Sequence, residues 1–158
     1  MVHLINFEDK LMRGPSPFSD AEREIISAFT SGLNACTYCH RSHSFLAEEL
    51  GVSKAVVPAL LDNIDSAPID ARLRPILRYV RKLTLMPSRL VEADATAVYD
   101  AGWDSEALFH AIAIAAYFNF CNRITAGAGL DVPDTTLRDA AKHLVEKGYK
   151  TSYGGLKP

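Results

Sequence analysis

Cysteine is scarce in this sequence, with three residues in 158, which excludes a small scaffold held together by several disulfides. Long apolar runs are missing as well, because the longest, residues 111–118, is far shorter than a membrane span. The first residues contain no apolar segment of a secretory signal. Neither sign of charge dominates, with 17 Lys and Arg against 19 Asp and Glu, so nothing indicates a nucleic-acid partner or a membrane surface. We therefore expect a cytoplasmic protein with reduced thiols.

What remains is the composition of an ordinary globular domain, with 48% hydrophobic and 23% charged residues. We expect one domain over residues 1–158, without internal repeats or a linker. No stretch alternates polar and apolar residues with the period of two that half-buried strands show, whereas several segments place apolar residues at helical spacing. The predicted fold is all-α, with about seven helices around one long apolar helix.

Cap signals and apolar spacing predict where the helices lie. Ser19 and Glu22 form a capping-box pattern that opens the first firm helix. A later helix is apolar almost all round, which predicts burial in the core or at a subunit contact. Residues 1–18 are expected to be a lead-in, and residues 149–158 a flexible tail. The expected helices cover residues 20–32, 34–51, 53–63, 70–85, 88–101, 105–126 (the apolar one) and 135–148.

The most informative stretch holds Cys36 and Cys39, followed by His43 four residues after the second cysteine. If Asn34 caps this helix, both thiols lie in its first turn, where free N–H groups and the helix dipole favour a thiolate. The two cysteines, His40 and His43 would then share one face, within roughly 100° of one another. This pattern is typical of a dithiol redox site with its own acid–base groups.

The same layout predicts a role for each group. Cys39 lies a turn beyond the cap and beside two histidines, so we assign it the attack, which on a peroxide yields a sulfenic acid. Cys36 would then condense with that acid to form a disulfide. His43 can exchange a proton with Cys39, and Glu24 can join this path if the first two helices cross near the thiols. Taken alone, the helix of Glu24 favours a carboxylate at the rim of the core.

Other interpretations of the cysteines stay open. Structural zinc is one, although the Cα atoms of Cys36 and His43 would lie about 10.5 Å apart along a helix, an awkward spread around one ion. The others are a pair of inert core cysteines, and a non-catalytic helical oligomer that senses oxidants or binds a metal. Cys121, in the apolar helix, is expected to be a small buried side chain without a catalytic role. His110, on the same helix, is expected to be a satisfied core or interface histidine.

Glu24, Cys36, Cys39 and His43 are spaced as E-x11-C-x2-C-x3-H. This spacing resembles the signature of the alkylhydroperoxidase AhpD-like branch of the carboxymuconolactone decarboxylase superfamily. The resemblance implies that the dithiol reduces hydroperoxides to alcohols without a metal, haem or another cofactor. It also implies that Cys39 attacks and Cys36 resolves, while the glutamate and the distal histidine form a proton relay that activates the thiols.

Two further stretches, residues 101–108 and 117–123, are similar to the peroxidase-related subgroup of that family, so the resemblance extends over residues 10–132. It implies an all-helical protomer in a homotrimer or homohexamer, re-reduced by a dithiol partner such as a lipoylated or thioredoxin-like protein. Tyr38 stands where well-studied members have a histidine, and His40 is a candidate auxiliary group in its place. A decarboxylase-type activity, known elsewhere in the superfamily, is the remaining alternative.

Overall fold

The computed structural model describes residues 2–149, and this part of the chain forms eight α-helices, one 3-10 turn and no strand. The expected all-α fold is confirmed. The elements are α1 (Val2–Arg13), α2 (Asp20–Leu33), α3 (Thr37–Glu49), α4 (Val56–Asp62), α5 (Leu73–Leu85), η1 (Pro87–Arg89), α6 (Glu92–Asp100), α7 (Ser105–Gly127) and α8 (Asp134–Lys147).

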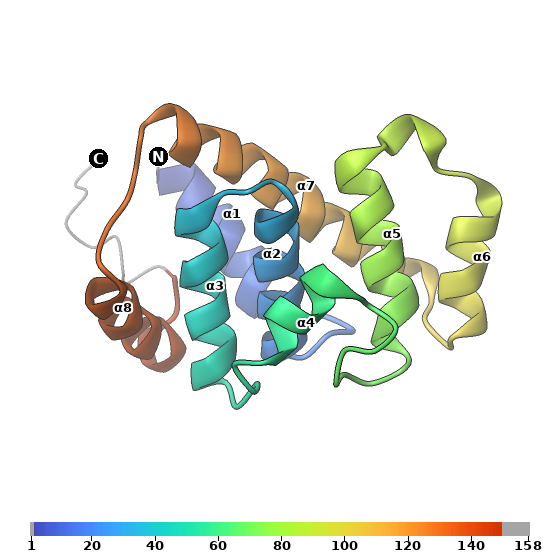
Figure 1. Ribbon diagram of the computed structural model, residues 1–158, viewed down its shortest axis with the longest axis horizontal. Coiled ribbons are helices and arrows are strands. Elements are labelled where there is room, and N and C mark those ends of the chain that lie inside the picture. Colours follow the sequence, from blue (N-terminus) through green and yellow to red (C-terminus); the bar gives the residue numbers. More distant parts are fainter. Residues whose placement is uncertain (1, 150–158) are drawn as a thin grey trace.

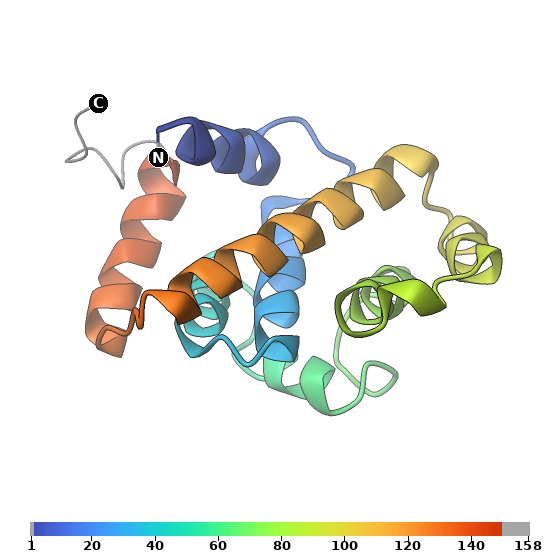
Figure 2. The ribbon, with the colours of Figure 1, turned by 90° about the horizontal axis from the view of Figure 1, so that it is seen from above.

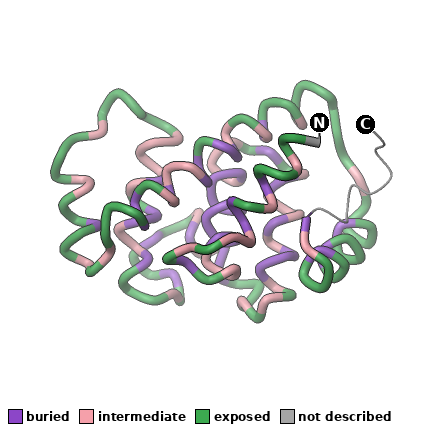
Figure 3. Tube along the Cα trace, turned by 180° about the vertical axis from the view of Figure 1, so that it is seen from behind, coloured by how far each residue is buried: buried purple, intermediate pink, exposed green. Residues whose placement is uncertain are grey.

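Helix α2 lies at the centre of the molecule and packs against α1, α3, α4, α5 and α7. Helices α5 and α6 form one end of the molecule and α8 the other, and α7 runs between these ends (Figure 1 and Figure 2). Figure 3 shows the buried positions gathered in the central helices and the exposed ones on the outer loops. Side chains of α2 beyond its first turn therefore lie in the interior of the molecule.

The capping box predicted from sequence begins α2. The hydroxyl of Ser19 accepts the Glu22 N–H at 3.2 Å, and the Glu22 carboxylate accepts the Ser19 N–H at 2.8 Å. Beyond this cap the helix is buried on almost every side, with Ile26 and Phe29 fully enclosed. Polar side chains join this face at little cost where, as for Thr30, the hydroxyl donates to a carbonyl one turn earlier.

Helix α7 has 23 residues, and its apolar surface is only partly covered. Ala111, Ile114 and Phe118 are buried, whereas Phe109 and Ile124 are exposed. No helix in residues 2–149 is long and apolar enough to cross a membrane. The buried face of α7 packs against α2 and α3, and this contact positions the site described below.

The start of the chain differs from expectation. Residues 1–18 were expected to lead into the first firm helix, but α1 occupies most of this segment. Its inner face carries Glu8 together with Leu11 and Met12, all three buried. A buried carboxyl interrupts the apolar spacing, so the helical pattern is weak in the sequence.

Two later boundaries also differ. The helix expected over residues 88–101 is divided into η1 and α6, because Val91 is extended and its N–H is accepted by the Asp94 carboxylate at 2.8 Å. Tyr149, expected to begin a flexible tail, is buried. The remainder of that tail, residues 150–158, lies outside the described residues.

Candidate active site

The turn between α2 and α3 delivers the first cysteine to the site. We expected Asn34 to cap α3, but it ends α2, and its side-chain amide donates to the Oδ1 atoms of Asn119 and Asn122 on α7 at 3.1 and 2.9 Å. Ala35 follows with a positive φ of 53°, which redirects the chain. Cys36 therefore becomes the N-cap residue of α3. The asparagine contacts fix this turn against α7.

Both thiols of the CxxC motif are free, are buried and share one neighbour on α7. The hydroxyl of Thr125 lies 3.1 Å from Cys36 Sγ and 3.4 Å from Cys39 Sγ. The cysteines are 7% and 5% exposed, so exposure does not distinguish an attacking thiol from a resolving one. Thr125 was missed by sequence analysis, since it lies 86 residues from Cys39 and belongs to no recognisable spacing.

Burial raises the pKa of the Cys39 thiol to about 11, although hydrogen bonds from Thr125 and Asn122 oppose this rise. The sequence-based expectation was the opposite, because the first turn of a helix favours a thiolate. Desolvation is the larger effect here, since the sulfur is enclosed by side chains and the thiolate would lose its hydration. Cys39 is therefore a thiol at neutral pH and needs a base to become nucleophilic.

A carboxylate–imidazole pair lies in the same part of the core. His43, one turn after Cys39 on α3, has its Nδ1 atom 2.6 Å from Oε2 of Glu24 on α2. Glu24 is 0% exposed, so the expectation of a rim carboxylate from its helix alone was wrong. Burial alone would raise the pKa of Glu24, but hydrogen bonds and charges from His43 and Arg13 hold it below its ordinary value. The ionised carboxylate accepts the Nδ1 proton, which leaves Nε2 of His43 as the basic nitrogen.

Two residues outside the sequence motif complete the partners of Glu24. Arg13 donates from Nη2 to Glu24 Oε1 at 2.6 Å, and the Tyr149 hydroxyl donates to the same oxygen at 2.8 Å. The Arg13 guanidinium also lies over the Tyr149 ring, 5.0 Å from its centroid. Sequence analysis missed both, because they fall in segments expected to be a lead-in and a tail. Together with His43 they give the buried carboxylate a full set of donors.

The ring of His43 is held from another side by α7. The Phe118 ring meets it edge-to-face, with centroids 4.3 Å apart. Such a contact fixes the plane of the imidazole without occupying its nitrogens. The histidine is thus oriented by Glu24 at Nδ1 and by the edge-to-face contact with Phe118.

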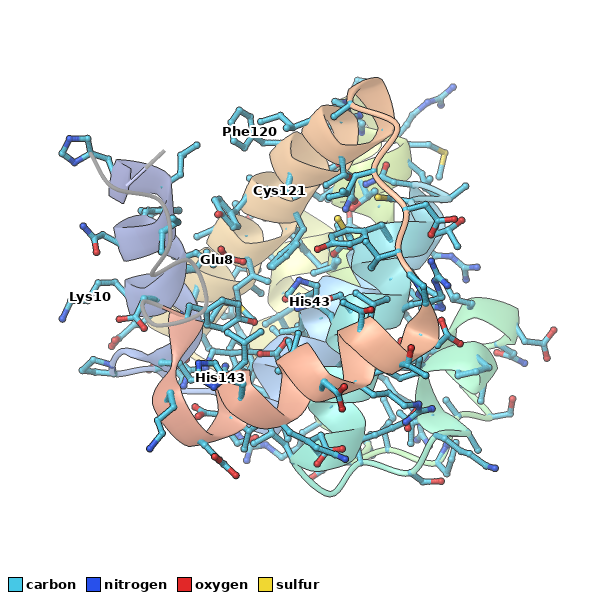
Figure 4. The ribbon with its side chains drawn as sticks, turned by 90° about the vertical axis from the view of Figure 1, so that its left-hand side faces the viewer. Glu8, Lys10, His43, Phe120, Cys121 and His143 are labelled. Atoms are coloured by element: carbon cyan, nitrogen blue, oxygen red, sulfur yellow. The ribbon has the colours of Figure 1, made fainter. Side chains whose placement is uncertain are left out.

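Cys39 and His43 both line one cavity of about 400 Å³, which we call the main cavity. Helices α1, α3, α7 and α8 supply its walls, and no lysine or arginine of residues 2–149 lines it. Figure 4 shows His43, Cys121 and Glu8 around this interior space, on α3, α7 and α1. Most of the other lining residues are apolar: Leu4, Ile5, Leu46, Phe118, Phe120, Ile124, Leu130, Leu137, Ala140 and Leu144. The space suits a ligand with an apolar body and a small polar reacting group.

Cys36 opens into a different space. A second hollow of about 280 Å³, the Cys36 hollow, is lined by this cysteine with Thr37, Ala126 and Asp131 among others, and Cys39 does not line it. Tyr38, Thr125 and Leu130 line both spaces and form the partition. The two sulfurs are thus approached from different sides.

The two candidate auxiliary residues behave differently. The Nδ1 atom of His40 lies 3.0 Å from the carbonyl oxygen of Ala28, and His40 does not line the main cavity. It therefore does not substitute for the family histidine that Tyr38 replaces. Burial raises the pKa of Tyr38, and the nearby Cys39 adds to the rise, so its hydroxyl stays protonated as a hydrogen-bond donor.

Cys121 and His110, both on α7, were expected to have no part in the chemistry. Cys121 is half-buried and lines the main cavity, so it is less enclosed than expected. His110 Nε2 lies 2.9 Å from the carbonyl oxygen of Leu11, as expected of a satisfied histidine. In the described part of the chain, no three His, Cys, Asp or Glu side chains are arranged to hold a metal ion.

No protein-family model and no curated protein matches the sequence. Among solved structures, the chain is similar to an uncharacterised peroxidase-related protein from Silicibacter sp. TM1040, with a TM-score of 0.76 and 27% identity over 82% of this chain and 68% of the other. It is also similar to an alkylhydroperoxidase AhpD core protein, an uncharacterised peroxidase-related protein from Ralstonia eutropha JMP134, with a TM-score of 0.79 and 27% identity over 85% and 71%.

These similarities agree with the resemblance seen in the sequence. Residues 2–149 of this chain contain helices and no strand, and each of the two solved structures matches more than four-fifths of the chain. In fold and in the spacing of its motif residues, this chain is therefore similar to AhpD-like, peroxidase-related proteins of known structure.

Proposed function

We propose that this protein is a dithiol oxidoreductase that reduces organic hydroperoxides to alcohols, with Cys39 as the attacking thiol. The observation that supports this most is that Cys39 and His43 line the same cavity, while His43 is hydrogen-bonded to Glu24 behind it. A thiol of raised pKa beside an imidazole that a carboxylate orients is the arrangement of a base-activated nucleophile. Cys36, at the start of the same helix and sharing Thr125 with Cys39, supplies the resolving thiol.

In the first step His43, oriented by Glu24, takes the proton of the Cys39 thiol. The thiolate attacks the terminal peroxide oxygen, so that an S–O bond forms while the O–O bond breaks. The sulfur is oxidised to a sulfenic acid, and the peroxide is reduced to an alcohol once its leaving oxygen gains a proton.

In the second step the Cys36 thiol attacks the sulfenic sulfur of Cys39. An S–S bond forms, and the hydroxyl group leaves as water with the proton of the Cys36 thiol. The disulfide then returns to the dithiol by exchange with an external dithiol, which becomes oxidised in turn. The Cys36 hollow gives this reductant a separate approach, because it is not shared with Cys39.

The test is anaerobic titration of the reduced protein with cumene hydroperoxide, with mass spectrometry of the thiols and quantification of the alcohol. We expect one Cys36–Cys39 disulfide for each alcohol formed. Cys36→Ser should leave a dimedone-reactive sulfenic acid on Cys39, and Cys39→Ser should form no alcohol. The matched control, Cys121→Ser, should still form the disulfide. Equal consumption of peroxide by the wild type and Cys39→Ser would remove Cys39 from the proposed role.

A further inference from the structure

Glu8 is a buried carboxyl in the wall of the main cavity that the proposed mechanism leaves unused. It comes from α1, is 8% exposed, and lines the same space as Cys39 and His43. Figure 4 shows it on a different helix from His43, with Cys121 of α7 nearby. Burying a carboxyl group in an apolar wall costs free energy unless the group is hydrogen-bonded, paired with a cation or protonated.

Among the described residues, the two cations that act on Glu8, Arg13 and His43, are both hydrogen-bonded to another carboxylate. The Tyr117 hydroxyl is hydrogen-bonded to both Glu8 and Cys121. Arg13 is already bound to Glu24, and His43 donates to the same carboxylate. Within residues 2–149, the titratable and charged groups that act on Glu8, or that it acts on, include Arg13 on α1, Glu24 on α2, Tyr38 and His43 on α3, Tyr117 and Cys121 on α7, and Tyr149.

This environment keeps a proton on Glu8 near neutral pH. Burial raises the pKa of its carboxyl to about 7, although His43 and the Tyr117 hydrogen bond oppose the rise. Other groups in the wall do not offer a proton as readily. Burial raises the pKa of both Tyr38 and Tyr117 above the ordinary value of tyrosine.

The proposed peroxide reduction needs such a proton at one particular place. When a thiolate displaces an alkoxide, the leaving oxygen departs on the side away from the sulfur, into the apolar part of the cavity. An unprotonated alkoxide there is strongly disfavoured. His43 receives its proton on the α3 wall that also carries Cys39, whereas Glu8 belongs to the α1 wall.

The geometry points to Glu8 as a second acid–base residue of the main cavity, which gives its proton to the oxygen that leaves when Cys39 attacks a hydroperoxide. This inference rests on the proposed function. In the balanced step the S–O bond forms and the O–O bond breaks. The O–H bond of Glu8 breaks as well, and its proton forms a new O–H bond with the leaving alkoxide. The products are the sulfenic acid on Cys39, the free alcohol, the Glu8 carboxylate and His43 carrying the proton of the thiol. Before the next cycle His43 gives up that proton to solvent and Glu8 regains one.

The test compares two oxidants in single-turnover reactions of the wild type and Glu8→Gln. With tert-butyl hydroperoxide the leaving alkoxide needs a proton, and general acid catalysis of this kind is worth about 100-fold or more. With peracetic acid the leaving group is a carboxylate that needs none. Glu8→Gln should therefore slow the first reaction about 100-fold and leave the second unchanged at the same pH. The matched control, Asp9→Asn, alters the next carboxyl of α1, which does not line the cavity, and should react like the wild type.

A pH series gives a second readout. With tert-butyl hydroperoxide, the wild-type rate should rise with pH as Cys39 ionises and then level off above about pH 7, as Glu8 loses its proton. The Glu8→Gln rate should continue to rise. Tyr117→Phe, which removes a hydrogen bond that lowers the pKa of Glu8, should move the level-off point to higher pH.

Several outcomes would overturn the inference. An equal loss with both oxidants would make Glu8 a structural residue, and no loss with either would return the proton transfer to His43. A wild type that forms no Cys36–Cys39 disulfide with either oxidant would refute the proposed function itself, and the role of Glu8 with it.

Discussion

Replacing Glu8 by glutamine should stabilise the protein above neutral pH, whatever the protein catalyses. The variant keeps the size and most of the hydrogen-bonding capacity of the side chain but cannot ionise. In the wild type the unfolded chain ionises at the ordinary carboxyl value of 4.5, whereas burial delays ionisation in the folded state to about 7. Between these values the unfolded state binds fewer protons than the folded state, so stability falls as pH rises.

The magnitude follows from the two pKa values. Each tenfold difference in proton affinity corresponds to about 1.4 kcal/mol. The rise from 4.5 to about 7 therefore costs the wild type about 3 kcal/mol at pH 8 and about 1 kcal/mol at pH 5. Glu8→Gln removes this dependence, so its free energy of unfolding should exceed that of the wild type by about 2 to 3 kcal/mol more at pH 8 than at pH 5.

Urea denaturation of both proteins at the two pH values measures this change, with Asp9→Asn as the control for removal of a carboxyl from α1. Other titrating groups are common to the wild type and the variant and cancel in the difference. A difference between Glu8→Gln and the wild type that is the same at pH 5 and pH 8 would refute the reasoning. It would mean that Glu8 ionises at the same pH in the folded and unfolded states.

Three further predictions follow from the site. Glu24→Gln should lower peroxide turnover about 100-fold. It should also lower the free energy of unfolding by about 3 kcal/mol at neutral pH. This difference from the wild type, measured by urea denaturation, should disappear as the pH falls below the lowered pKa of Glu24. Thr125→Val should raise the pKa of Cys39 further, which slower alkylation by iodoacetamide at pH 8 would reveal and unchanged alkylation would contradict. Ala126→Phe, in the Cys36 hollow, should slow re-reduction by dithiothreitol but not disulfide formation. Ala140→Phe, in the main cavity, should slow disulfide formation but not re-reduction. If both variants slow both steps equally, the two spaces are not separate routes.

The sequence was sufficient for the helices with clear punctuation. The capping box at Ser19 starts a helix where the pattern predicted it, and the helix expected from residue 105 also begins there, with Asp104 as its N-cap. Local hydrogen bonds determine both positions. The spacing of Cys36, Cys39 and His43 places them along one helix, as predicted. The positive φ of Ala35, which the sequence does not reveal, moves the N-cap of α3 from Asn34 to Cys36.

The contacts made over long sequence distances could not be predicted in this way. Arg13 and Tyr149 reach Glu24 from segments with weak apolar spacing, and nothing in either segment signals a buried partner. Glu8 was hidden for the same reason, since a carboxyl on an inner face looks like solvent-exposed charge in a sequence. The raised pKa of Cys39 depends on the packing around the sulfur, which its place at a helix start does not reveal.

The two donors that share one oxygen of Glu24 are 136 residues apart, because Arg13 lies on α1 and Tyr149 follows α8. During synthesis the cysteines emerge from the ribosome long before Tyr149 does, and domains of this size fold as units. A nascent chain that has already exposed both sulfurs therefore still lacks one of the donors that hold the carboxylate in place. The contacts of Glu24 are complete only when both α1 and the segment after α8 have packed around it. Incomplete chains therefore carry the thiols without all the contacts that position the carboxylate.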